Sequence, residues 1–300
     1  MQPPAKPRPV IPDYELILKI GGGSHGDVWL ANGMMGVYRA VKVVWRDRFG
    51  DAKSYLREFE GIRRFAAISL REPSQLGLLH AGRCPSNDFF YYVMELADDA
   101  ERGGDIDPRT YVPLTLRELR LRRGRLPAAE AAALGADLAR ALVVLHRNGL
   151  VHRDIKPANI VIVGGVAKLA DVGLVAVASD EPAFIGTRDF APPEGAGAPQ
   201  ADLFSLGIVI YKLATGFESQ RFPRLPRELA GWTDRRAFLE LNEIILMACN
   251  PEVSHRFRDA SAMLGELLLV QAGRSVRRVR AADKRSMRRL RIARALARLF

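Results

Sequence analysis

The sequence predicts an α+β fold in which short strand-like segments come first and longer helical segments follow. Strand-like apolar runs occupy 14–20, 37–45 and 89–96. Apolar residues then recur at helical spacing over 127–149. A chain of 300 residues can form one large domain or two lobes.

Composition limits the class of protein. The formal net charge is +11, but residues 274–300 contain eleven Arg or Lys and one Asp, so the rest of the chain is nearly neutral. The two cysteines are too few for a disulfide framework. No apolar run approaches the roughly 18–20 residues of a membrane span, and no apolar signal core is present, so we expect a cytoplasmic protein.

The N-terminal segment 1–12 contains five prolines and is expected to be a disordered leader. Segment 14–20 then runs into G-G-G-S-H-G-D-V at 21–28. Gly21, Gly23 and Gly26 fit G-x-G-x-x-G-x-V, in which backbone N–H groups can approach phosphate oxygens. A plain hairpin turn is an equal alternative. A dinucleotide-binding turn is less favoured, because the following residues are strand-like.

The strand-like run 37–45 contains a single lysine, Lys42, which periodicity alone would place in solvent. Segment 54–65 is predicted to be an amphipathic helix that offers Glu58 and Glu60 as acidic partners; its apolar face is formed by Tyr55, Phe59, Ile62 and Phe65. The run 89–96 is typical of a buried strand. The acidic, aperiodic residues 98–113 are expected to form a surface insertion.

Two helices are predicted next. A short basic helix spans 116–125, and Pro127 opens a longer one that ends at Gly149. The apolar stripe of the second helix consists of Leu134, Leu138, Ala141, Leu142 and Leu145. This helix leads directly to the most informative stretch of the chain.

That stretch runs from 152 to 173 and reads H-R-D-I-K-P-A-N, V-I-V and K-L-A-D-V-G. Segments 160–163 and 166–170 are predicted to pair as strands around a Gly-Gly turn, which returns Asp171 to Asn159. A carboxylate and an amide oxygen can hold Mg²⁺ together with substrate phosphates. Asp154 can take a hydroxyl proton, and Lys156 can offset the charge of a transferring phosphoryl group.

These motifs resemble the catalytic loop and metal-binding motif of the protein kinases, and Lys156 resembles the serine/threonine branch. The resemblance covers about 13–270. It implies a bilobal fold with a β-rich N-lobe and hinge at 13–97, which contains one helix, and a larger helical C-lobe at 98–270. The cofactors would be ATP and Mg²⁺ or Mn²⁺, bound between the lobes.

The resemblance also assigns residues to the nucleotide. Lys42 would hold the α- and β-phosphates with Glu58 as its partner, and Glu60 is the runner-up that we expect in solvent. Met94 would lie behind the adenine, and backbone groups from Glu95 to Ala97 would bind its edge. The full set of expected ATP-binding residues is Gly21, Gly23, Gly26, Val28, Ala40, Lys42, Met94, Glu95 and Ala97.

Further roles follow from the same resemblance. Asp202, in the expected central helix 202–216, would accept backbone hydrogen bonds from the catalytic loop. Glu194 would pair with Arg256. The expected regulatory residues are Arg153, which would bind a phosphate in the activation segment, Ser179 as the activating site, and Thr187 as a contact of Asp154 that positions substrate.

The sequence departs from the family pattern at two positions. Val172 replaces the usual Phe of D-F-G, which puts in doubt how firmly the helix carrying Glu58 is held, and Pro192 replaces the Ala of A-P-E. We expect an active Ser/Thr kinase that phosphorylates protein substrates, itself included. The first alternative is a pseudokinase scaffold. The second is a small-molecule phosphotransferase, which the activation-segment residues disfavour.

The last segment, 271–300, is predicted to be a basic amphipathic tail. Its apolar stripe consists of Met287, Leu290, Ala293, Leu296, Leu299 and Phe300. The covering bases are Arg288, Arg289, Arg291, Arg294 and Arg298. It could be a solvated linker, or it could bind an anionic membrane as a peripheral contact, an acidic partner or, least favoured, nucleic acid.

Overall fold

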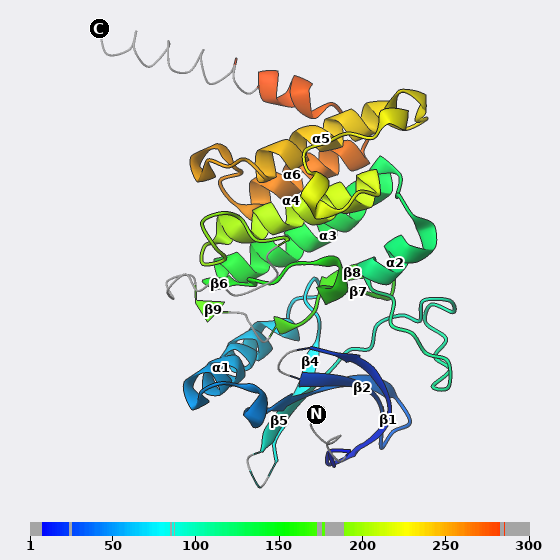
Figure 1. The fold of residues 1–300 in the computed structure, drawn as a ribbon, viewed down its shortest axis with the longest axis vertical. Helices are drawn as coiled ribbons and strands as arrows, with labels where there is room; N and C mark the ends of the chain where they lie inside the picture. The colour runs from blue at the N-terminus through cyan, green and yellow to red at the C-terminus, as the bar shows by residue number, and fades with distance from the viewer. Residues whose placement is uncertain are drawn as a thin grey trace, which may run out of the picture.

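A computed structural model describes residues 8–23, 26–84, 86, 88–172, 176–177, 189–282 and 285. The α+β prediction is confirmed, because an antiparallel sheet with one helix precedes a mostly helical region. Figure 1 shows the sheet and α1 at one end of the molecule and the stacked helices α3–α6 at the other.

The N-lobe is built on a five-stranded sheet of order β1-β2-β3-β5-β4, with every neighbouring pair antiparallel. Its strands are β1 (Tyr14–Gly22), β2 (Gly26–Gly33), β3 (Tyr38–Trp45), β4 (Leu78–Arg83) and β5 (Phe89–Met94). The helix α1 (Ala52–Ser69) follows the single turn η1 (Arg46–Arg48). It begins at Asp51, whose carboxylate accepts the N–H of Ser54 at 2.8 Å.

The C-lobe contains α2 (Leu116–Arg123), α3 (Ala128–Arg147), α4 (Pro199–Thr215), α5 (Arg235–Ala248) and α6 (Ala260–Gln271). Two short strand pairs lie between the lobes: β6 (Leu150–Val151) with β9 (Ala176–Val177), and β7 (Ile160–Val163) with β8 (Val166–Leu169). Short turns are η2 (Pro157–Asn159), η4 (Ser219–Arg221), η5 (Arg227–Gly231) and η6 (Val253–His255).

Sequence chemistry explains where the two central helices begin and end. Pro127 precedes α3, and Gly149 lies just after it with φ of 71°, a backbone angle that glycine adopts without strain. The predicted stripe of α3 is buried. The helix α4 ends at Gly216, also left-handed with φ of 74°. One core joins α3, α4, α5 and α6 to the inner face of the sheet, and a smaller core covers its outer face.

Residues 8–12 of the predicted disordered leader contact the sheet. Within 8–12, Ile11 is buried against the outer core of the sheet, and Arg8 lies over the Trp29 ring at 5.4 Å from its centroid. The disordered-leader prediction is therefore wrong for these residues, because Ile11 interrupts the polar segment with an apolar anchor. Residues 1–7 lie outside the described part of the chain.

The insertion 98–113 contacts the turn between β7 and β8. The Asp98 carboxylate accepts the N–H groups of Gly164 and Gly165 at 2.9 and 3.0 Å. The Asp99 carboxylate accepts three backbone N–H groups of the same loop, from Glu101, Arg102 and Val112. The segment is thus an ordered loop whose acidic residues satisfy backbone donors.

The beginning of the basic tail belongs to the C-lobe. Residues 276–282 are helical, Val276 is fully buried, and the Ser275 hydroxyl donates to Glu240 at 2.6 Å. Arg277 pairs with Glu243 at 2.6 Å, and Arg280 pairs with Glu266 at 2.7 Å. The predicted boundary at 270 is therefore too early. The apolar stripe and the covering arginines of the predicted tail lie outside the described residues.

Replacing Val276 tests this docking. Val276→Ala should lower the free energy of unfolding by about 2 kcal/mol, because a buried aliphatic side chain is truncated. Arg278→Ala, on the exposed side of the same turn, should change it by less than about 0.5 kcal/mol. Chemical denaturation of both variants measures the difference. Equal stability of the two variants would indicate that 274–282 is a linker and not part of the C-lobe.

No helix among the described residues has both the length and the apolar character that a membrane span requires.

Candidate active site

The loop after β6 is held by Asp202 of α4, whose side chain is buried. Its two carboxylate oxygens accept the N–H of His152 at 2.8 Å and the N–H of Arg153 at 2.9 Å. His146 Nε2 donates to the same carboxylate at 2.9 Å. Burial alone would raise the pKa of Asp202, but the interactions with His146 and His152 together outweigh it and lower the pKa. Hydrogen bonds to the charged Asp202 carboxylate therefore hold the loop that follows β6.

His152 is a buried hydrogen-bonding residue. Its Nε2 donates to the carbonyl of Ala170 at 3.1 Å, and its Nδ1 accepts the N–H of Asp154 at 3.4 Å. Nε2 thus joins the loop to the end of β8, and Nδ1 makes a contact within the loop. This geometry agrees with a packing role for His152.

Two predicted catalytic residues, Asp154 and Lys156, meet the predicted metal ligand Asn159. Lys156 Nζ and Asn159 Nδ2 each lie 2.7 Å from Asp154 Oδ2. Asn159 Nδ2 also donates to the Asp154 carbonyl at 3.1 Å. Because the amide nitrogen of Asn159 is used in this way, its amide oxygen is the atom suited to a cation.

The hairpin returns Asp171 to Asn159 as the sequence predicts. Strands β7 and β8 pair Ile160 with Leu169, and the N–H of Ala170 donates to the carbonyl of Asn159 at 2.8 Å. Gly164 and Gly165 have φ of 57° and 79°, the left-handed pair that a tight hairpin turn requires. Local strand pairing therefore brings Asn159 next to Ala170, the residue before Asp171.

Lys42 of β3 lies between two carboxylates from distant parts of the chain. Its Nζ makes a short ion pair with Asp171 Oδ1 and lies 3.7 Å from Glu58 Oε1 of α1. Glu60, the alternative partner, pairs instead with Arg63 and Arg64 on the exposed side of α1. The geometry thus brings Glu58, and not Glu60, to Lys42.

Charge balance in this group is set by burial and pairing. Burial alone would lower the pKa of the Lys42 ammonium, but the carboxylates of Asp171 and Glu58 help to raise it. Burial would raise the pKa of Asp171, yet the Lys42 ammonium lowers it. Burial keeps the pKa of Glu58 raised in spite of Lys42. The ammonium and the Asp171 carboxylate are therefore charged at neutral pH.

The glycine-rich segment joins β1 to β2, and its Gly26 lies next to the Lys42 side chain. A Cβ at Gly26 would lie 2.5 Å from the carbonyl oxygen of Val43, so only glycine fits there. Val28 lies opposite Lys42 in the sheet, and Ala40 lies opposite Met94. Alternation along the strands places these side chains on the same face as Lys42.

The hinge follows β5. Met94 is buried, and the carbonyl of Ala97 accepts the Tyr111 hydroxyl at 2.9 Å. The Glu95 carboxylate accepts Lys168 Nζ of β8 at 2.7 Å and the N–H of Gly77 at 2.7 Å. Lys168 and His146 were not predicted to belong to the site, because their partners Glu95 and Asp202 lie far away in sequence.

The predicted pair of Glu194 and Arg256 is present as a two-point contact, with Arg256 Nη2 3.0 Å from Glu194 Oε2. Arg256 is buried and also donates to the carbonyl of Asn250 at 2.7 Å. Val172 is buried in the main core, which also contains Ile62 and Phe65 of α1. The predicted regulatory residues Ser179 and Thr187 lie outside the described residues, whereas Arg153 is described, with φ of 72°.

The donor set suits a hard cation that carries a phosphate ligand. Asn159 and Asp171 offer an amide oxygen and a carboxylate at one end of the hairpin, and Lys42 adds an ammonium group beside them. Mg²⁺ takes such oxygens and shares its remaining positions with phosphate oxygens and water. These residues therefore fit MgATP.

Comparison with known proteins gives the family. Residues 14–269 match the protein kinase domain. The serine/threonine-protein kinase PknB of Mycobacterium leprae is 29% identical over 290 residues, which cover 87% of this chain and 43% of that protein. The serine/threonine-protein kinase PknA of Corynebacterium glutamicum is 27% identical over 290 residues, which cover 87% of this chain and 57% of that protein. The chain spans only about half the length of these relatives. From its match over residues 14–269, the chain belongs to the protein kinase family.

Proposed function

We propose that this protein is an active kinase that transfers the γ-phosphoryl group of MgATP to Ser or Thr hydroxyls of protein substrates, including its own chain. The observation that carries the proposal is the convergence of Asp154, Lys156 and Asn159 at one carboxylate oxygen, beside the linked group of Lys42, Glu58 and Asp171. Catalysis of phosphoryl transfer needs mainly positioning and charge stabilisation.

Each side chain has one part in the reaction. Asp154 would orient the substrate hydroxyl and accept its proton, and Lys156, 2.7 Å away, would offset charge on the transferring group. Asn159 and Asp171 would hold Mg²⁺, which when bound neutralises charge on the nucleotide phosphates. Lys42, directed by Glu58, would hold the α- and β-phosphates.

The regulatory part of the proposal comes from the sequence. Arg153 would bind a phosphate on Ser179 through charge-assisted hydrogen bonds, and Thr187 would contact Asp154. Binding of the tail beyond residue 285 to an anionic membrane or an acidic partner stays a prediction from its composition.

A paired measurement tests catalysis against the scaffold alternative. Purified protein with MgATP should show a raised melting temperature and incorporation of phosphate into its own Ser or Thr residues. Mass spectrometry locates the phosphate, and the nucleotide without divalent cation is the control. Stabilisation without phosphate transfer, to itself or to a general acceptor protein, would favour a pseudokinase scaffold.

A further inference from the structure

A buried acidic residue follows the glycine-rich segment and has no part in the site described above. Asp27 is 7% exposed, and its Oδ2 accepts the indole N–H of Trp45 at 3.1 Å and Arg48 Nη2 at 2.6 Å. Its Oδ1 lies 2.6 Å from Lys19 Nζ. Burial would raise the pKa of Asp27, but the hydrogen bonds from Lys19, Arg48 and Trp45 lower it. The carboxylate is therefore charged and fully engaged.

Arg48 holds both ends of the glycine-rich turn at once. While its Nη2 binds Asp27, its Nη1 donates to the carbonyl of Gly23 at 3.2 Å. The N–H of Gly23 in turn donates to the carbonyl of Gly26 at 2.9 Å. A guanidinium can bind two acceptors in a fixed geometry, which an ammonium cannot do. We call these contacts of Gly23, Asp27, Trp45 and Arg48 the loop brace.

The loop brace lies on the face of the sheet opposite to Lys42. Asp27 pairs with Val43, which together with Trp45 belongs to the outer core. Val28 pairs with Lys42 on the inner face. Side chains alternate between the faces of a strand, so Asp27 and Arg48 can restrain the glycine-rich turn without occupying the space for nucleotide phosphates.

We propose that Arg48 and Asp27 are positioning residues that preorganise the glycine-rich turn for the phosphates of the nucleotide. This inference rests on the proposed use of ATP. Fixing the turn before binding removes part of the entropy cost that the nucleotide would otherwise have to offset. Because η1 lies between β3 and α1, the brace also joins the turn to the segment that leads to Glu58.

The first test is direct binding of MgATP and of adenosine by calorimetry. Arg48→Ala should weaken MgATP binding about tenfold. It should leave the affinity for adenosine unchanged, because adenosine has no phosphates to meet the turn. The Michaelis constant for ATP should rise by a similar factor, with a smaller change in kcat. Equal weakening of both ligands would overturn the proposal, since it would indicate general damage to the N-lobe.

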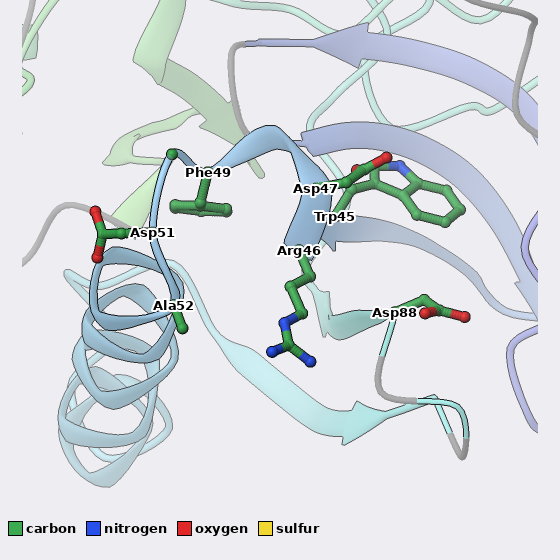
Figure 2. A pocket seen from close by; sticks show the side chains of 8 residues that line it. Trp45, Arg46, Asp47, Phe49, Asp51, Ala52 and Asp88 are labelled. Carbon is green, nitrogen blue, oxygen red and sulfur yellow. The ribbon is translucent and has the colours of Figure 1, made fainter.

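Arg46→Ala is the matched control for the loss of charge. Arg46 belongs to the same turn, η1, but it lines a surface pocket of about 600 Å³. Figure 2 shows its side chain pointing into this pocket, away from the Trp45 indole. Its removal should leave MgATP affinity within about twofold of wild type, because exposed charges are screened. If Arg46→Ala weakens MgATP binding as much as Arg48→Ala does, long-range charge explains both effects and the proposal is overturned.

Asp27→Asn separates bracing from electrostatics by the direction of its effect. If charge alone mattered, removal of an acid near the phosphates would strengthen MgATP binding, whereas loss of the brace should weaken it several-fold. Arg48→Lys should also weaken binding, because it keeps the charge but loses the two-point contact. Tighter binding by Asp27→Asn, or wild-type binding by Arg48→Lys, would overturn the proposal.

The same titrations keep the two proposals apart. Wild-type protein that binds neither MgATP nor adenosine would refute the proposed function, and the brace with it. If the wild type binds MgATP, and Arg48→Ala and Asp27→Asn bind it with the same affinity, the loop brace alone would be refuted.

Discussion

Asp154→Asn is expected to lower the turnover of peptide or self-phosphorylation by about 10²- to 10⁴-fold, the usual contribution of a positioned general base. The substitution keeps the size of the side chain but removes its charge and its ability to accept a proton. Affinity for MgATP should stay nearly the same, because the proposed nucleotide contacts are made by other residues. Steady-state kinetics with saturating ATP, together with direct nucleotide binding, measures both quantities.

A matched substitution controls for charge and folding. Glu228→Gln removes the carboxylate of an exposed residue in η5 of the C-lobe, so turnover should be unchanged. Melting temperatures of both variants verify that the fold is kept. A loss of turnover below about tenfold in Asp154→Asn, with binding intact, would remove Asp154 from the role of base.

The part of the site that the sequence predicts well is local in the chain. The hairpin from Ile160 to Leu169 follows from two apolar runs and a Gly-Gly turn, and its pairing brings Asn159 and Asp171 together. Asp154 and Lys156 precede it by a few residues. Short loop closure and a strongly specified register leave few alternatives for such a segment.

Contacts between distant segments were predicted only where the family resemblance supplied them, and the others were not predicted. Lys42 and Glu58 meet because α1 packs against the sheet that contains β3, and periodicity alone would have placed Lys42 in solvent. Arg48 belongs to no motif, Asp27 occupies an unspecified position of the glycine-rich motif, and Lys168 pairs with Glu95 across 73 residues. Such pairs depend on tertiary packing that no window of sequence contains.

Secondary structure shows the same division. The helix α3 is predicted almost to its ends, because Pro127, Gly149 and a continuous apolar stripe all agree. Strand β4 was not predicted, since it is mostly exposed and lacks alternation in its burial. Ile11 and Val276 were assigned to segments outside the folded domain by composition, although each supplies one buried anchor.

The second large effect concerns the support beneath the catalytic loop. Asp202→Ala is expected to lower the free energy of unfolding by about 3–5 kcal/mol, because it removes the acceptor of several buried donors at once. The N–H groups of His152 and Arg153 would be left without this carboxylate. Arg153 has φ of 72°, an unfavourable angle for a side chain with a Cβ, and Asp202 helps to hold it there.

The pH dependence of the same variant gives an independent check. The folded-state pKa of Asp202 is lowered, so its charged form contributes stability above the unfolded pKa of about 4, and this contribution is lost as the pH falls further. The difference in unfolding free energy between wild type and Asp202→Ala should therefore be constant between pH 7 and 8 and shrink below about pH 4. Glu228→Ala is the surface control, with an expected loss below about 0.5 kcal/mol. Denaturation of Asp202→Ala at the wild-type midpoint would show that the carboxylate is dispensable, and the catalytic loop would then need another support.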